Sequence, residues 1–552
     1  MKRSLKPRVA LLIAVWFAGC SGQITTPPEQ LPNVVGPRPE PELPAVASPL
    51  TRMTGTQYNN TLRDLFAPIV VPAQTVPPDV SIESYDNNAG AQTPSAALIE
   101  AYQSGAESVA SAAMASPAAL LGCTPNGRAS EDACAVSFFA RFVPSAFRRR
   151  ATATELAGLE SFYALARADG ADFATAITLS LEAILQAPAF LYRVEVGVPV
   201  EGRTHVVRLG PFELASRLSY FLWNTMPDPV LFAAAESGAL ASNAGIEAQA
   251  ERMLADPRAR TAVANFHRQW LQFERMKGMT KDPTMFPKFN VATVGALEAS
   301  AEKYVDGLFF AGGTFKGLLT DDRAWVNDDL AQIYGVASPG PTLSLVAVDR
   351  TQRSGILTNA GLMAAFAHQT ADSPVQRGVF VLTSLLCSGL PPPPPGVNLS
   401  PPSPTSNAPL TTRDRFEQQH EQGSCASCHR AIDGIGFGFE YYDASGRWRA
   451  EEAGLPINAK GWFTGTKDPL LTGSFDGAVE LGQRLADSKV AQTCLVKNWL
   501  RYALGVDHSG IDAKGLQPIF TAFTASNFQM RALVVAITTS EAFQTRVVGA
   551  AP

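Results

Sequence analysis

The chain has 552 residues, of which 46% are hydrophobic and 17% charged, a composition typical of a globular protein. It is long enough for more than one hydrophobic core, because single domains usually contain about 100–200 residues. The net charge of −5, without a basic stripe, excludes the usual features of a nucleic-acid-binding protein, so no nucleic-acid partner is expected.

Residues 1–20 have the pattern of an export signal. Four basic residues within the first eight precede the apolar stretch VALLIAVWFAGC, which is too short to span a bilayer. The stretch ends in FAGC, which resembles a bacterial lipobox, so we expect Cys20 to carry a lipid that anchors the protein to a membrane. The alternative is a plain secretory signal with an incidental Cys20. Ser21, and not an aspartate, follows the cysteine, and this resembles the sorting signal of outer-membrane lipoproteins. We therefore expect an outer-membrane lipoprotein of the cell envelope, facing the periplasm or the surface.

Most of the chain beyond this signal has helical periodicity. A capping-box pattern occurs at Thr54 and Gln57, and another at Thr152 and Glu155. Helices are expected over residues 54–66, 148–167, 173–188, 209–226, 255–276, 291–310, 326–335, 477–505 and 527–547. Alternating strands are scarce, and the best short candidates are residues 204–210 and 343–349.

Four cysteines are candidates for disulfides. Cys123 and Cys134 flank a polar, turn-rich loop, which in an exported protein predicts a local disulfide. Cys387 and Cys494 lie far apart in the sequence, and they either pair with each other or remain buried thiols.

The sequence Cys425–Ala–Ser–Cys428–His429 is the strongest chemical signal in the chain. Two thiols three residues apart at the start of a helix can each add to one vinyl group of a haem, and the next imidazole can bind the iron. The spacing favours a covalent haem c, with Cys425 and Cys428 as anchors and His429 as the proximal ligand. Three alternatives remain open: a zinc site, for which only His420 is a nearby additional ligand; a thioredoxin-like redox pair, which would need a βαβ context; and a structural disulfide.

The sequence leaves the sixth iron ligand open. The candidates are His420, His368, Met363, His508 and Met530. His420 lies so close to the motif that a solvated histidine, or one beside a haem propionate, is the preferred interpretation. A methionine ligand would raise the potential and favour electron transfer, whereas an open site would permit peroxide or oxygen chemistry.

The stretch after the motif contains aromatic and acidic residues. The aromatic residues expected to wall the haem are Phe437, Phe439, Tyr441 and Trp448. The carboxylates that could form an acid/base pair are Asp433, Glu440 and Asp443. Exposed or salt-bridged structural carboxylates near Arg447 and Arg449 are the preferred interpretation of these acids.

These patterns predict an all-α fold of several packed helical units, with a small cytochrome c-like CxxCH module and few short strands. The expected parts are a lipoprotein signal at 1–20, a proline-rich tether at 21–49, helical modules at 50–122 and 123–200, a central helical domain at 205–345, the CxxCH module with a polyproline linker at 350–460, and a C-terminal helical module at 470–548.

The stretch SCASCHRAIDGIGFGFEYYDASGRWR, with RSGILTNAGLMAAFAH and LPPPPPGV before it, resembles the haem-motif module of large exported proteins of planctomycetes and myxobacteria. These proteins form the "domain of unknown function 1592" family, with companion domains 1587, 1595, 1588 and 1585. The stretches RMTGTQYNNTLRDLF, FFARFVPSAFRRRATATELAGLESFY, LGPFELASRLSYFLWNTMPDPVLF and CLVKNWLRYALG resemble the other modules in their usual order.

The resemblance covers about residues 50–545, and it implies a haem c on Cys425, Cys428 and His429 but no established reaction. One departure is Gly434, where the family usually has the proline of an Asp-Pro pair, so the rigidity of this turn is in doubt. We expect an exported, membrane-anchored protein that transfers electrons to or from a redox partner protein. Two alternatives are a haem enzyme with an open iron site, acting on peroxide or an extracellular organic substrate, and a non-redox surface binding or assembly protein with a structural CxxC.

Overall fold

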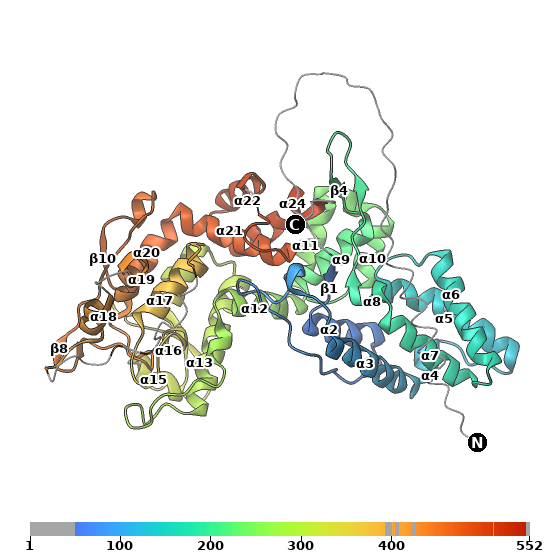
Figure 1. Ribbon diagram of the computed structural model, residues 1–552, viewed down its shortest axis with the longest axis horizontal. Coiled ribbons are helices and arrows are strands. Elements are labelled where there is room, and N and C mark those ends of the chain that lie inside the picture. Colours follow the sequence, from blue (N-terminus) through green and yellow to red (C-terminus); the bar gives the residue numbers. More distant parts are fainter. Residues whose placement is uncertain are drawn as a thin grey trace. The chain divides into compact units, whose positions relative to one another are not determined.

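The computed structural model describes residues 50–391, 400, 402, 408–420, 426–511 and 513–547. The expected signal and tether, Cys20, Cys425 and most of the polyproline linker lie outside these residues. The described chain is mainly α-helical, as predicted, and forms two compact units (Figure 1). Unit 1 comprises residues 58–78 and 94–193, and unit 2 comprises residues 50–57, 79–93 and 194–547. Among the described helices, none has both the length and the apolar character needed to cross a bilayer.

Unit 1 is built from helices. They are α3 (Ala96–Met114), α4 (Pro117–Leu121), α5 (Arg128–Phe147), α6 (Ala153–Ala168), α7 (Phe173–Gln186), α8 (Pro188–Leu191) and most of α2 (Gly55–Phe66). Helix α7 packs against both α3 and α6, since apolar residues cover much of its surface. The predicted capping box at Thr152 and Glu155 opens α6, and Cys123 forms a disulfide with Cys134 of α5.

Unit 2 contains the remaining helices. They are α9 (Pro211–Leu222), α10 (Pro229–Glu236), α11 (Asn243–Ala255), α12 (Arg258–Trp270), α13 (Val291–Phe310), α14 (Phe315–Thr320), α15 (Asp328–Tyr334), α16 (Ala360–Ala365), α17 (Pro374–Phe380), α18 (Thr412–His420), α19 (Ala426–Gly436), α20 (Gly477–Asp487), α21 (Lys489–Leu504), α22 (Ala513–Ala525), α23 (Met530–Thr538) and α24 (Glu541–Gln544). The 3₁₀-helices are η2 (Ala89–Ala91), η3 (Ala239–Ala241), η4 (Phe273–Met276), η5 (Ile356–Thr358), η8 (Phe437–Phe439) and η9 (Pro469–Leu471), and η6 (Val381–Leu385) is a π-helix.

The strands are short. They are β1 (Thr51–Arg52), β2 (Tyr192–Arg193), β3 (Val198–Pro199), β4 (Val206–Arg208), β5 (Arg323–Val326), β6 (Ser344–Ala347), β7 (Glu451–Glu452), β8 (Leu455–Pro456), β9 (Lys460–Trp462), β10 (Ser474–Asp476) and β11 (Thr545–Val547). The two predicted strand segments are present as β4 and β6. Strand β4 lies between β3 and β11, with Thr545 opposite Arg208, and β6 pairs antiparallel with β5.

Aromatic side chains form the centre of the core of unit 2. The ring of Phe266 in α12 stacks on Trp499 of α21, with 3.6 Å between centroids, and both are buried. Trp270 stacks on the same phenylalanine. Helices far apart in the sequence are therefore joined by one apolar cluster.

Some expected helices are divided in the structure. Residues 477–505 form α20 and α21, which meet at Ser488, and the Ser488 hydroxyl accepts a hydrogen bond from the Ala491 N–H (3.2 Å). Residues 527–547 form α23, α24 and β11. Pro229 begins α10, where the missing N–H of proline costs no intrahelical hydrogen bond because the first N–H groups of a helix have no partner within it.

Candidate functional site

Helix α19 carries the described part of the CxxCH motif. Cys428 is exposed near its first turn, and the next residue, His429, has 23% of its side chain exposed. One turn further on, Asp433 is almost completely buried. The i, i+4 spacing places the imidazole of His429 and the carboxylate of Asp433 on one face of the helix.

Asp433 joins two histidines. Its Oδ1 lies 3.2 Å from His429 Nδ1, and its Oδ2 lies 2.6 Å from Nδ1 of His420, the last residue of α18. The two imidazole rings lie 3.6 Å apart between centroids. Because a carboxylate only accepts, both Nδ1 atoms donate, and each Nε2 carries the lone pair that can bind a metal. One ligand atom from each of the three residues lies within 4.8 Å of the others.

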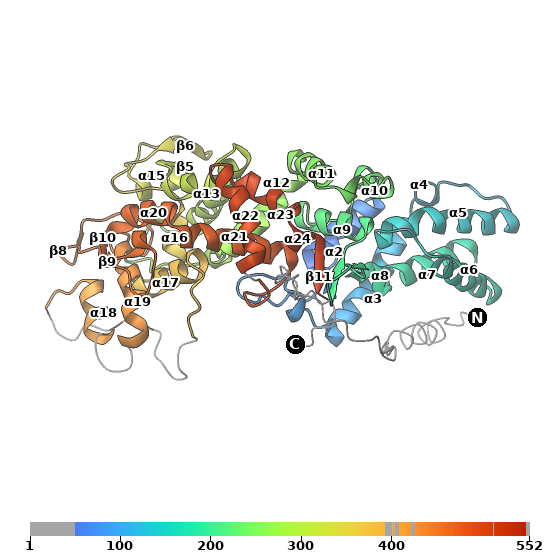
Figure 2. The same ribbon diagram turned by 90° about the horizontal axis from the view of Figure 1, so that it is seen from above.

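Close contact with α17 fixes the position of α19. A Cβ on Gly378 would overlap the carbonyl of Ile432, and one on Gly436 would overlap the carbonyl of Pro374. The backbones of the two helices thus approach each other more closely than any side chain would allow. Figure 2 shows α17, α18 and α19 next to one another within unit 2.

Arg377 of α17 holds the segment that follows α19. Its buried guanidinium donates to the carbonyls of Phe439 (3.0 Å), Tyr442 (2.7 Å) and Asp443 (3.0 Å), and to that of Met363 in α16 (3.0 Å). These bonds satisfy carbonyls that would otherwise be buried without donors. No local sequence pattern predicts this role, because an arginine in a short helix is usually solvent-exposed.

Gly434, which follows Asp433 in α19, lies under a tryptophan. A Cβ there would overlap the indole of Trp462, whose Nε1–H donates to the Arg430 carbonyl (3.1 Å). Trp462 also packs against Phe437. The indole therefore takes up the space that a side chain at Gly434 would need, and its hydrogen bond holds the turn of α19.

The three acidic candidates have separate surroundings. Asp433 contacts the histidines, and Asp443 accepts from the backbone N–H groups of Ser445 (2.8 Å) and Arg447 (3.0 Å), which closes a turn. Glu440 is buried, and this burial, with nearby Asp372, raises its pKa well above the usual value. The structure therefore supports the structural interpretation of Asp443 rather than an acid/base pair.

The five distal candidates lie on different elements. His420 stacks against His429 itself, beside the expected proximal ligand. Met363 in α16 and Met530 in α23 are completely buried in the core. The carbonyl of His368 accepts from Lys281 (2.9 Å), and the Nε2 of His508, after α21, accepts from Arg501 (2.9 Å).

The described part of the motif fits a c-type haem in its donor chemistry. Exposed Cys428 leaves room for a thioether bond, and the neighbouring His429 has its Nδ1 anchored, which orients Nε2 as a ligand. Of the motif's two cysteines, Cys425 lies outside the described residues.

The aromatic residues expected around a haem fit only in part. Phe437 is covered by Trp462 and by the guanidinium of Arg413, and Phe439 is completely buried in the core. Their rings are thus already covered by protein groups, which corrects the expectation that they wall a haem. Tyr441 and Trp448 stack on each other and are half-buried, so they keep surface that a bound group could cover.

Family models match the chain in five successive parts. They are the proteins of unknown function DUF1587 at residues 51–115, DUF1595 at 134–195, DUF1592 at 209–336, DUF1588 at 353–452 and DUF1585 at 473–543. The DUF1588 match contains α18, α19 and the CxxCH motif. Comparisons with curated proteins and with solved structures found no match. The chain therefore belongs to the DUF1592 family, with its companion domains DUF1587, DUF1595, DUF1588 and DUF1585.

Proposed function

We propose that this protein is an exported, membrane-anchored c-type haem protein that transfers electrons at the cell envelope. The observation that carries the proposal is the anchored His429 beside exposed Cys428, within a CxxCH motif. The short name of the matching model, PSCyt3, points in the same direction. A haem held by Cys425, Cys428 and His429 would supply one-electron transfer.

The residues around the motif have defined tasks in this proposal. Asp433 holds the proton at His429 Nδ1 and so fixes the tautomer and orientation of the ring. His420 donates to the other oxygen of the same carboxylate and covers one face of His429. A lipid on Cys20 would anchor the protein to the outer membrane, with residues 21–49 as the tether.

A second candidate is a non-haem transition-metal site. The specific observation is the set of His420, His429 and Asp433, whose potential ligand atoms lie within 4.8 Å of one another. Two histidines and one carboxylate are a ligand set used for zinc and for non-haem iron. A single metal bound by both histidines would compete with a haem for His429.

Pyridine haemochrome spectra and metal analysis separate the two candidates. The protein is produced with a cytochrome c maturation system and purified in its folded state for metal analysis, and a portion is then denatured for the haemochrome spectrum. We expect one covalent haem per chain, lost in the double variant Cys425→Ala, Cys428→Ala and retained in His205→Gln, a control at an exposed histidine outside the motif. A haem-free protein that holds one zinc or iron, lost in His420→Gln, would overturn the haem proposal.

The spin state of the iron then distinguishes a carrier from an enzyme. A six-coordinate low-spin iron that does not bind CO when reduced supports electron transfer. A high-spin iron that binds CO would instead support the enzyme alternative, because it has an open coordination position.

A further inference from the structure

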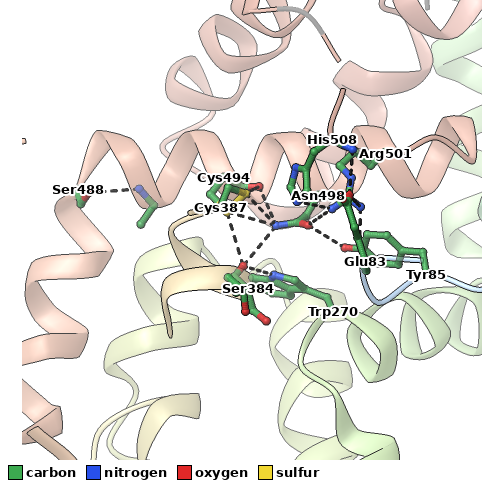
Figure 3. Close-up of a disulfide and its surroundings, with 12 residues drawn as sticks. Glu83, Tyr85, Trp270, Ser384, Cys387, Ser488, Cys494, Asn498, Arg501 and His508 are labelled. Atoms are coloured by element: carbon green, nitrogen blue, oxygen red, sulfur yellow. Dashed lines mark hydrogen bonds and ion pairs between the residues drawn. A yellow bond between two sulfur atoms is a disulfide. The ribbon is translucent and has the colours of Figure 1, made fainter. Parts of the chain in front are cut away.

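A pocket of about 330 Å³ lies in unit 2 and contains no residue of the CxxCH motif. It is lined by α21, by η6 and the residues after it, by Trp270 of α12 and by residues 83–85. Its size is at the lower end of the range for small-molecule sites. Figure 3 shows the polar side chains and the disulfide that surround it.

One face of α21 forms the polar side of this pocket. Cys494, Lys497, Asn498 and Arg501 follow at spacings of three and four residues, so their side chains lie along one stripe of the helix. Lys497, Asn498 and Arg501 line the pocket, and Cys494 is joined by a disulfide to Cys387, which also lines it. The disulfide thus fixes two walls of the pocket to each other.

Asn498 connects the walls through hydrogen bonds. Its amide N–H groups donate to the Ser384 carbonyl (3.3 Å) and toward the Cys494 sulfur (3.3 Å), and its Oδ1 accepts from Tyr85 (3.1 Å) and Arg501 (3.2 Å). These partners come from η6, α21 and the segment before η2. The pocket is therefore a preformed site with fixed polar groups, which lowers the entropic cost of binding.

The charges that line the pocket do not cancel. The buried guanidinium of Arg501 pairs with Glu83 at 2.6 Å. Lys497 is half-buried and, within the part of the chain that the structure describes, has no hydrogen bond or ion pair. Glu83 interacts with both Lys497 and Arg501, so one carboxylate faces two cationic side chains and the lining keeps one excess positive charge, which favours a monoanion.

His508 offers an additional donor. Its Nε2 accepts from Arg501 (2.9 Å), so Nδ1 carries the proton of the neutral ring. Burial and the neighbouring Arg501 lower the pKa of His508 to about 4, which keeps the ring neutral at physiological pH. The Nδ1 atom is buried without a hydrogen-bond partner among the described residues, and such a donor is costly to leave unsatisfied.

We propose that this pocket binds a small organic carboxylate, with the anion near Lys497 and His508 and an apolar body against Trp270 and Leu390. A carboxylate carries one negative charge at neutral pH and two oxygens, which matches one unpaired ammonium and one unused N–H donor. The indole of Trp270 and the side chain of Leu390 supply apolar surface to the lining of the pocket. The site is independent of the haem proposal, since it shares no residue with α19.

Isothermal titration of the purified protein with benzoate tests the proposal, and benzamide and benzylamine serve as the neutral and cationic analogues. We expect one benzoate per chain, with benzamide at least about tenfold weaker and benzylamine not bound, because only benzoate completes the charge-assisted hydrogen bonds. Equal affinity for benzoate and benzamide, or no binding of benzoate at millimolar concentration, would overturn the proposal. The comparison of the three ligands uses only the wild-type protein, so it does not depend on whether a variant folds.

A variant pair locates the site. Lys497→Met keeps the length of the side chain but removes its charge, and we expect benzoate affinity to fall at least about tenfold. The control Lys467→Met removes an exposed lysine outside the pocket and should bind benzoate like the wild type. Circular dichroism verifies that both variants are folded. Unchanged benzoate binding in a folded Lys497→Met protein would contradict the assignment.

Discussion

Asp433 is the residue on which the geometry of the candidate centre depends. It is the common acceptor for His420 and His429, and it is almost completely buried, so its two hydrogen bonds are protected from water. A carboxylate that accepts from the Nδ1–H of a metal-bound imidazole makes this imidazole a stronger donor. In a haem protein, such a ligand stabilises the oxidised iron and lowers its reduction potential.

For the proposed haem with His429 as its proximal ligand, replacing Asp433 by asparagine should therefore raise the reduction potential. The neutral amide accepts from His429 less strongly, so the oxidised state loses stabilisation. Redox titration followed by visible absorption measures the change. The control Asp487→Asn removes an exposed carboxylate on α20 and should leave the potential unchanged. A potential that falls, or stays constant, in Asp433→Asn would contradict this role.

Glu440 makes the stability of unit 2 depend on pH. Burial and the carboxylates of Asp372 and Glu452 raise the pKa of Glu440 above its ordinary value of about 4.5. Above about pH 4.5, the unfolded state therefore loses a proton that the folded state still holds. The Glu440 contribution therefore falls as pH rises above that value. Glu440→Gln mimics the protonated group and should gain stability over the wild type between about pH 5 and pH 8 in urea unfolding. The exposed control Glu451→Gln should show no such gain. A stability difference between Glu440→Gln and the wild type that stays constant across this pH range would contradict the raised pKa of Glu440.

At the level of elements, the contact of α17 with α19 positions the site. Gly378→Ala should destabilise unit 2 by about 1–3 kcal/mol, because the new methyl group overlaps the Ile432 carbonyl and separates the helices. Gly295→Ala is the matched control, since Gly295 lies within α13 with open space around it. Alanine there should be neutral or stabilise by up to about 1 kcal/mol. Urea unfolding measures both, and equal stability of the two variants would contradict the close packing.

The local elements were predictable where the chain contains local signals. The capping box at Thr152 and Glu155 opens α6, and the helix expected at 291–310 has those bounds in the structure. The division at Ser488 was not predictable from periodicity, because α20 and α21 are both helical and neither glycine nor proline separates them. Helix α20 packs against α14, and α21 packs against α22 and α23, and these tertiary contacts are not contained in the local sequence.

The candidate centre was also predictable only where its residues are close together in the sequence. The spacing of Cys425, Cys428 and His429 is local information, and it identifies the motif without a structure. The contact of His420 with Asp433 requires α18 and α19 to lie together. Arg377 binds four carbonyls: three belong to residues more than 60 positions later in the chain, and the fourth belongs to Met363 in α16. Such contacts depend on the tertiary fold.

For the whole molecule, the disulfides should stabilise the two units separately. The Cys387–Cys494 disulfide joins positions 107 residues apart in unit 2, and Cys123–Cys134 joins positions 11 apart in unit 1. Loop entropy predicts contributions of about 5 and about 3 kcal/mol, respectively. In each double Cys→Ala variant, hydrogen exchange should increase in the peptides of one unit only. Equal loss of protection in both units would contradict the division.

The central claim is that the CxxCH motif binds a haem covalently, and peptide mass mapping tests it most directly. Trypsin cleavage after Arg415 and Arg430 releases residues 416–430, which contain Cys425, Cys428 and His429. From protein produced with cytochrome c maturation, this peptide should carry the mass of one haem, and the double variant Cys425→Ala, Cys428→Ala should lack it. A wild-type peptide recovered with two free thiols, or with a disulfide between them, would contradict the account.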